Sequence, residues 1–209
     1  MENRVRKIIQ TLNKLYPDPK PFLNFRTPFE LLVAAILSAQ CTDARVNLVT
    51  PALFRAAKTP QALLKLGERK LMAYVKSTGF YRAKTKSIMD ASRMLIEKFS
   101  GKVPAELEQL QTLPGVGRKT ASVVLAQAFH IPAFPVDRHV LRVANRLGLA
   151  HAKTPDNTAD QIETTIPKNL WITLHMQLVA HGRKICRPHP KCGACSLLPY
   201  CPEGKRRML

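Results

Sequence analysis

The sequence predicts an all-α protein of two lobes, and three observations carry this prediction. Apolar residues recur at helical spacing in successive segments. Capping residues and glycines separate those segments, and no stretch alternates apolar and polar side chains as a half-buried strand does. The proline-rich residues 131–135 are where we expect the hinge between the lobes.

The expected helices of the first half are 28–38, a helix from Thr42 through Val49, one that begins at Thr59-Pro60, 68–77 and 81–99. Residues 28–38 are apolar all round, which is typical of a buried central helix. Threonine caps the next two helices, and the second of them has proline at its first helical position. Glycines follow the last two helices closely, as they do at helix ends.

The expected helices of the second half are 106–111, 118–129, a helix that Asp137 caps and Gly148 ends, 155–164 and 168–181. Residues 187–209 are rich in proline, cysteine and basic residues and lack a helical pattern, so we expect a loop that a metal holds. The segment up to Tyr16 carries charges throughout and lacks the apolar core of a signal peptide.

The charge of the chain points to a polyanionic partner. Lys and Arg number 33 against 14 Asp and Glu, which gives a net charge of +19. A field of that sign attracts phosphate polyanions. Anionic membranes are the rival partner, but no stretch reaches the roughly 18 consecutive apolar residues of a spanning helix. The charge therefore favours nucleic acid as the partner, and the lack of such a stretch predicts no membrane partner.

Four of the five cysteines gather near the C-terminal end in the pattern C-x5-C-x2-C-x5-C, formed by Cys186, Cys192, Cys195 and Cys201. An odd number of cysteines with this clustering argues against a secreted disulfide framework, so we expect a metal site and a cytoplasmic, nucleoid-associated protein. Four thiolates suit tetrahedral Zn²⁺ or an iron–sulfur cluster, and the single C-x2-C pair favours a [4Fe–4S] cluster. Cys41 lies apart and is expected to be a small buried hydrophobe.

Residues 113–120, Leu-Pro-Gly-Val-Gly-Arg-Lys-Thr, separate two of the expected helices. Glycine allows positive φ and close approach of the backbone to another surface. The first N–H groups of the helix that follows lack intrahelical partners and carry the positive end of the helix dipole. We therefore expect Gly115, Val116, Gly117 and Arg118 to bind a DNA phosphate, which positions the duplex without reading its sequence.

This segment resembles the helix-hairpin-helix motif of the DNA glycosylase superfamily, and within it the endonuclease III family. The resemblance implies that Lys119 is the nucleophile, attacking the anomeric carbon of a damaged nucleotide and forming a Schiff base. A free lysine has a pKa of about 10.4. We expect burial beside Arg118 at the helix N-terminus to favour the neutral amine.

The sequence Val-Asp-Arg-His-Val at 136–140 extends the resemblance. It implies that Asp137 is the second catalytic residue, because a carboxylate stabilises the positive charge that develops on the sugar. Related adenine glycosylases lack the lysine, and 8-oxoguanine glycosylases lack the cysteine cluster. The combination of Lys119, Asp137 and four clustered cysteines therefore implies the branch that removes oxidised pyrimidines.

The family also implies DNA contacts and shows one departure. Gln40 is the expected plug for the hole left by a flipped base, Phe80 the expected wedge between bases, and His139 a third contact. A polar helix end, a core aromatic and a surface histidine are the respective alternatives. The family commonly has six residues between its first two cysteines and this chain has five. Arg187 and Lys191 in that shortened loop are still expected to contact phosphates.

The expected architecture is a helical barrel over residues 22–132 that contains the hairpin, and an iron–sulfur cluster domain formed by 1–21 and 133–209. DNA is expected to run between the lobes. The expected function is a bifunctional DNA glycosylase and AP lyase, acting as a monomer on damaged double-stranded DNA. A monofunctional glycosylase and a non-enzymatic DNA-binding iron–sulfur module are the alternatives.

Overall fold

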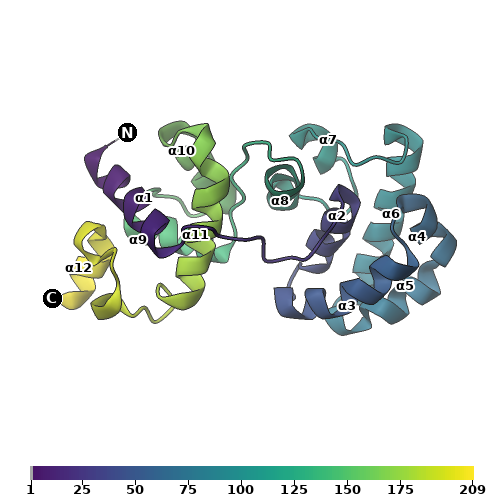
Figure 1. Ribbon diagram of the computed structural model, residues 1–209, viewed down its shortest axis with the longest axis horizontal. Helices are drawn as coiled ribbons and strands as arrows, with labels where there is room; N and C mark the ends of the chain where they lie inside the picture. The colour runs from purple at the N-terminus through teal and green to yellow at the C-terminus, as the bar shows by residue number, and fades with distance from the viewer. Residues whose placement is uncertain (1) are drawn as a thin grey trace. The chain divides into compact units, whose positions relative to one another are not determined.

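The computed structural model of the chain describes residues 2–209 and confirms an all-α protein. Twelve α-helices and four short 3-10 helices form this part of the chain, without a β-strand (Figure 1). One compact unit comprises the N-terminal residues up to Lys20 together with Pro132–Leu209, and the other comprises Pro21–Ile131. No helix among residues 2–209 combines the length and the apolar character needed to cross a bilayer.

The helices of the Pro21–Ile131 unit are α2 (Pro28–Leu37), α3 (Asp43–Ala56), α4 (Pro60–Leu66), α5 (Glu68–Val75), the 3-10 turn η1 (Lys76–Thr78), α6 (Tyr81–Phe99), α7 (Leu107–Gln111) and α8 (Arg118–Ala128). Helix α2 is buried from Phe29 to Leu37 and packs against α3, α6 and α8. It begins where the Thr27 side chain accepts a hydrogen bond from the Glu30 N–H at 3.2 Å. A helix without a polar face is stable only inside a core, as its composition predicts.

The caps expected in this unit form as predicted. The side chains of Thr42 and Thr59 accept hydrogen bonds from backbone N–H groups at the starts of α3 and α4. The expected helix 68–77 is shorter than predicted, because α5 ends at Val75 and η1 leads into Gly79, whose φ is +68°. Left-handed Gly79 therefore turns the chain into α6.

The helices of the other unit are α1 (Asn3–Leu15), α9 (Arg138–Leu147), α10 (Pro155–Thr165), η2 (Lys168–Leu170), α11 (Trp171–Lys184), η3 (Cys192–Ala194), η4 (Leu198–Tyr200) and α12 (Pro202–Met208). Helices α9 and α11 pack together, with α1 against α11 and with α10 and α12 against α9 (Figure 1). Arg4 of α1 donates to the carbonyl oxygens of Leu147 at 2.6 Å and Gly148 at 2.9 Å. These bonds satisfy the C-terminal carbonyls of α9.

Helices α1 and α12 of this unit are not among those predicted from the sequence. The expectation of a metal-held loop without helix over 187–209 is wrong for its last part, where α12 forms. The Sγ of Cys201 caps α12 by accepting from the Gly204 N–H at 3.2 Å, and Pro202 takes the first helical position. Glu203 pairs with Arg206 and Arg207, three and four residues on, which stabilises this short helix.

Candidate functional site

The hairpin between α7 and α8 is held by its apolar residues and by one glycine. Leu113 and Val116 are buried, and the Val116 N–H donates to the Leu113 carbonyl at 3.1 Å. Gly115 has a φ of +80°, and a Cβ added there would lie 2.7 Å from the Cβ of Ser87. Position 115 therefore strongly favours glycine, for its backbone conformation and for its close approach to α6.

The start of α8 is open to a ligand. Gly117 is its N-cap residue and no side chain caps the helix. The φ of Gly117 is −89°, so the second glycine of the motif does not use the left-handed conformation. A Cβ added to Gly117 would meet no atom within 4 Å. The first N–H groups of a helix have no intrahelical partner, so an open helix start of this kind is suited to an anion such as a phosphate.

The two glycines predict different results for the same substitution. Gly115→Ala should lower the free energy of unfolding by about 1–3 kcal/mol, because alanine is strained at positive φ and clashes with Ser87. Gly117→Ala should leave stability unchanged and weaken duplex DNA binding, because its methyl group enters the space at the start of α8. Thermal melting and DNA titration of both variants check this, and equal melting temperatures would contradict it.

Lys119 is the second residue of α8, and its side chain is exposed. The expectation that the protein buries this amine is therefore wrong for the structure as it stands. Arg118, the residue before it, is half-buried.

Asp137 caps α9, as the sequence predicts. Its Oδ1 accepts hydrogen bonds from the backbone N–H groups of His139 and Val140, each at 2.8 Å. No hydrogen bond to its Oδ2 occurs within residues 2–209. The two bonds fix the orientation of a half-buried carboxylate and leave its second oxygen available. Asp137 and Lys119 belong to different compact units.

Gln40 and Phe80, the two residues expected to enter the duplex, share an unusual backbone. Both are exposed, and their φ angles are +50° and +47°. Left-handed non-glycine residues are uncommon and concentrate at functional sites. The Phe80 side chain is 66% exposed, so the alternative of a core aromatic is wrong. Cys41 is half-buried, which corrects the expectation of a buried hydrophobe.

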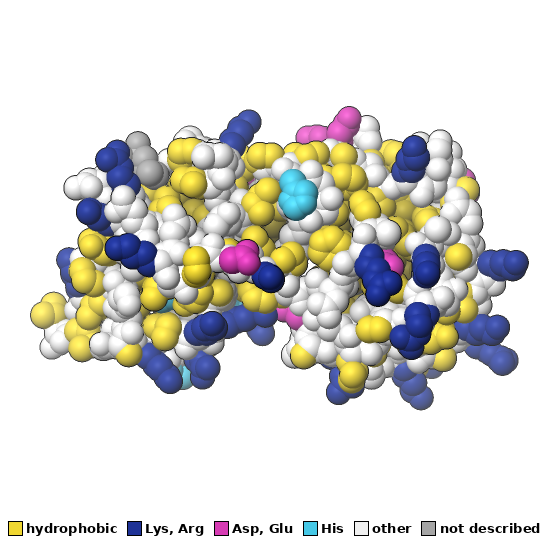
Figure 2. Space-filling model, in the orientation of Figure 1, with side chains coloured by type: hydrophobic (Ala, Val, Ile, Leu, Met, Phe, Trp, Pro, Cys, Tyr) yellow, Lys and Arg dark blue, Asp and Glu magenta, His cyan; other side chains and the backbone are white. Residues whose placement is uncertain are grey.

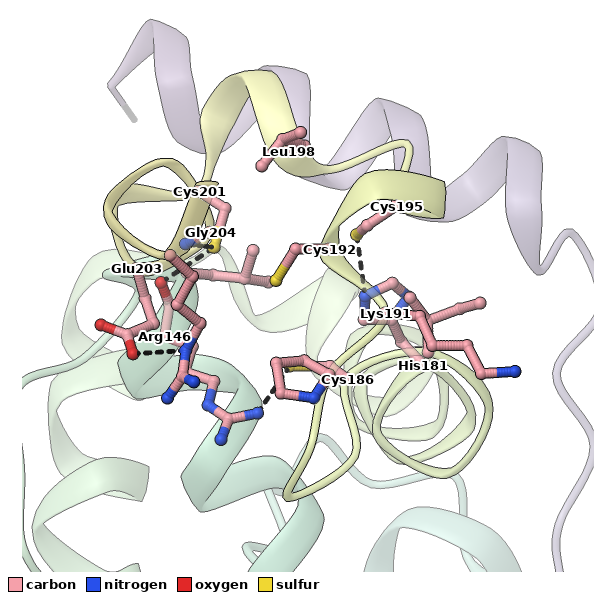
Figure 3. A pocket seen from close by; sticks show the side chains of 14 residues that line it. Arg146, His181, Cys186, Lys191, Cys192, Cys195, Leu198, Cys201, Glu203 and Gly204 are labelled. Carbon is pink, nitrogen blue, oxygen red and sulfur yellow. Dashed lines mark hydrogen bonds and ion pairs between the residues drawn. The ribbon is translucent and has the colours of Figure 1, made fainter. Parts of the chain in front are cut away.

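The four clustered cysteines line one pocket with about 360 Å³ of empty space, part of it open to solvent (Figure 3). Arg146 Nη1 and His181 Nε2 lie 3.5 Å from the sulfurs of Cys186 and Cys195. Burial raises the pKa of the Cys195 and Cys201 thiols and lowers that of His181 to about 4. Within residues 2–209, no three His, Cys, Asp or Glu side chains converge on one metal-ion position.

Four cysteine thiols are a donor set that fits a thiolate-bound metal centre, either one Zn²⁺ or an iron–sulfur cluster. In a tetrahedral zinc site every sulfur lies about 2.3 Å from the same ion. Iron–sulfur clusters are likewise held by cysteine thiolates, and here four thiols line one pocket.

The shortened loop after Cys186 is held by two arginines of α9 that the sequence analysis missed. Arg146 donates to the carbonyl oxygens of Arg187 at 2.6 Å and Pro188 at 3.0 Å. Arg142 donates to the Cys186 carbonyl at 2.9 Å. The side chains of Arg187 and Lys191 remain exposed. Nothing in the sequence pattern signals these bonds, because their partners lie 40 or more residues apart.

His139 lies close to the same group of side chains. Its Nδ1 is 3.2 Å from Arg142 Nη2, and the residue is half-buried. Burial lowers its pKa, against the opposing charge of Asp137. This histidine is therefore part of a packed contact between α9 and α11, which carries the Gly182 carbonyl that Arg142 also reaches at 3.0 Å.

Comparison with known proteins gives a consistent family. Residues 33–168 match the HhH-GPD superfamily base excision DNA repair protein family. The chain is 45% identical over 206 residues to an endonuclease III of Synechocystis, covering 98% of this chain and 94% of that one. It is 40% identical to the Escherichia coli K12 endonuclease III, with 93% of each chain covered. A solved structure of a trapped endonuclease III–DNA covalent intermediate matches with a TM-score of 0.93 at 41% identity, over 100% of both chains.

Proposed function

The chain belongs to the HhH-GPD superfamily of base excision DNA repair proteins, and from this premise we propose that it is a bifunctional DNA glycosylase and AP lyase that removes oxidised pyrimidines. The similarity to endonuclease III over nearly the whole chain supports both activities. The observation that carries the proposal is an exposed lysine at position 119, on the first turn of an uncapped helix that follows the hairpin. A solved relative forms a covalent intermediate with DNA, which is the step this lysine would perform.

In the proposed reaction the Lys119 amine first displaces the damaged base and then, as a Schiff base, promotes strand cleavage. Its nitrogen bonds to the anomeric carbon while the bond to the damaged base breaks, and the base leaves with the electron pair and takes up a proton. The sugar ring opens to a Schiff base, which acidifies the C2′ proton. Loss of that proton breaks the bond to the 3′ phosphate, and water then releases the lysine.

Asp137 supports the first of these steps. Its Oδ2 would supply negative charge as the sugar becomes positive, and the two bonds to Oδ1 keep the carboxylate from turning away. A fixed carboxylate requires no reorganisation as charge develops. It is also suited to accept the proton that Lys119 must lose before attack.

Duplex DNA is the proposed partner. The protein is proposed to bind it as a monomer, in the cytoplasm and in association with the nucleoid. Lys and Arg outnumber acidic side chains on the face of the molecule in Figure 2 and gather over α3, α4 and α5. The exposed Gln40 and Phe80 are suited to fill the space that a flipped nucleotide leaves. The start of α8, Arg187 and Lys191 would contact the phosphates.

The proposal is tested with a duplex that contains thymine glycol. The protein should remove the base and cut the strand on its 3′ side, leaving an unsaturated aldehyde rather than a phosphate or hydroxyl at the new 3′ end. Mass spectrometry of the products distinguishes these ends. Base removal without strand cleavage would instead indicate a monofunctional glycosylase.

A [4Fe–4S] cluster is the proposed cofactor, held by Cys186, Cys192, Cys195 and Cys201. When bound, it would cross-link α11 to the C-terminal segment through four thiolates. Arg146, which lies against the Cys186 sulfur, would partly neutralise the negative charge. The loop between Cys186 and Cys192 is one residue shorter than is common in the family, and the Arg146 guanidinium holds it through the carbonyls of Arg187 and Pro188. All four cysteines still line the pocket.

Metal analysis of the purified protein checks the cofactor. We expect about four iron and four sulfide per chain, with a brown absorbance. Cys192→Ser should lower the iron content and the melting temperature together, whereas Cys41→Ser, which lies outside the pocket, should change neither. One zinc per chain without iron would contradict the proposed cluster.

A further inference from the structure

Lys84 is a buried lysine that the proposed reaction does not use. It is the fourth residue of α6 and is 5% exposed. Its Nζ donates one hydrogen bond, to the Thr78 carbonyl at 2.7 Å, and no other hydrogen bond of this amine occurs within residues 2–209. Burying an ammonium group near a helix N-terminus is unfavourable on both counts. A charge in so costly a position calls for an explanation.

The amine holds the loop that carries Phe80. Thr78 is buried, and its hydroxyl donates to the Val75 carbonyl at 2.8 Å. The next two residues, Gly79 and Phe80, both have positive φ, and the Phe80 ring is exposed. The backbone N–H of Lys84 donates to the Phe80 carbonyl at 3.0 Å. Lys84 therefore binds this loop at two points. Its side chain donates to Thr78, which precedes the two residues of positive φ, and its backbone N–H donates to Phe80, the second of them. Burial also lowers the Lys84 pKa, because the ammonium form loses its hydration.

The next turn of α6 lies against the hairpin, a second segment of this unit that we propose contacts DNA. Ser87 lies three residues after Lys84 in α6. A Cβ added to Gly115 would lie 2.7 Å from the Cβ of Ser87, so α6 and the hairpin are in close contact. Residues three apart lie on the same side of a helix. The first two turns of α6 therefore support the Phe80 loop and the hairpin.

We propose that Lys84 is a positioning residue that holds Phe80 in the conformation that fills the space left by a flipped nucleotide. This inference rests on the proposed function and deepens it. The amine contacts no DNA. It supplies a buried donor that keeps the Thr78 carbonyl, and hence the left-handed turn after it, in one conformation.

The test compares two substrates for each variant. One is a duplex with thymine glycol, in which flipping leaves a gap in the stack. The other is a single strand with an abasic site, in which no gap has to be filled. Lys84→Met keeps the length of the side chain and removes its donors. We expect it to slow the duplex reaction about tenfold or more, as loss of a buried charged donor implies, and to cleave the single strand at the parental rate.

The ratio of the two rates is the deciding quantity, because partial unfolding lowers both rates equally and leaves the ratio unchanged. Lys86→Met, an exposed lysine on the same helix, is the matched control and should keep the parental ratio. Phe80→Ala should lower the ratio, and adding Lys84→Met should lower it little further, because both changes remove the same wedge. If Lys84→Met does not fold, Lys84→Gln is measured in the same way.

A parental ratio in a folded Lys84 variant would overturn the inference and leave the proposed function standing. Full additivity with Phe80→Ala would also overturn it, since the lysine would then act elsewhere. A parent protein that cleaves neither substrate would overturn the proposed function itself. The three results are distinguishable in one set of assays.

Discussion

Replacing Lys119 with glutamine should abolish strand cleavage while the fold and most of the DNA binding remain. Glutamine keeps nearly the length and polarity of the side chain but has no nucleophilic amine. Without a Schiff base the C2′ proton is not acidified, so the lyase step has no route. Loss of a covalent nucleophile commonly costs about 10⁴-fold or more in rate.

The structure explains why this variant should fold. Lys119 is exposed and packs into no core, and exposed substitutions usually change stability by less than about 0.5 kcal/mol. Lys98→Gln in the last turn of α6 removes an equal charge from the same unit outside the hairpin and serves as control. Single-turnover incision of an abasic duplex measures the effect. Parental incision by Lys119→Gln would show that another residue is the nucleophile.

Replacing Asp137 with asparagine should slow base removal by about 10²- to 10⁴-fold, the range associated with lost charge stabilisation or proton transfer. Asparagine caps helices as well as aspartate, and its oxygen can still accept from the His139 and Val140 N–H groups. Stability should therefore be preserved, and the loss of rate can be assigned to the missing charge.

Asp137→Ala provides the contrast. It removes the cap as well as the charge and should lower the free energy of unfolding by about 1 kcal/mol, which Asp137→Asn should not. Release of thymine glycol under single-turnover conditions and thermal melting, measured on both variants, separate the two roles. Turnover at the parental rate in Asp137→Asn would remove this carboxylate from the reaction.

Local chemistry made much of the fold predictable from the sequence. Thr42, Thr59 and Asp137 cap helices where their hydroxyl or carboxylate oxygens reach the next free N–H groups. The all-apolar segment from Phe29 to Leu37 is the buried central helix. Helix α12 was missed because its cap is a cysteine sulfur and its stability comes from side-chain pairs over a single short helix. Such a helix has too few apolar positions to show a period.

The candidate site also contains residues that local motifs made predictable and residues whose roles depend on long-range contacts. Lys119, Asp137 and the cysteines stand in local motifs. The cysteine spacing indicated a metal site, and the resemblance to the endonuclease III family implied the roles of Lys119 and Asp137. The exposure of Lys119 could not be predicted, because it depends on how the whole unit packs around α8. The roles of Arg142 and Arg146 depend on carbonyls more than 40 residues away, and that of Lys84 on a loop conformation. Long-range contacts of this kind leave no periodic signal in a sequence.

The central claim is that Lys119 joins covalently to damaged DNA, and reduction with borohydride tests it most directly. The protein is incubated with a thymine glycol duplex, the Schiff base is reduced, and the adduct is digested and mapped by mass spectrometry. The account predicts an adduct on Lys119 with the parent chain and none with Lys119→Gln. An adduct on another residue, or base release without any adduct, would contradict it.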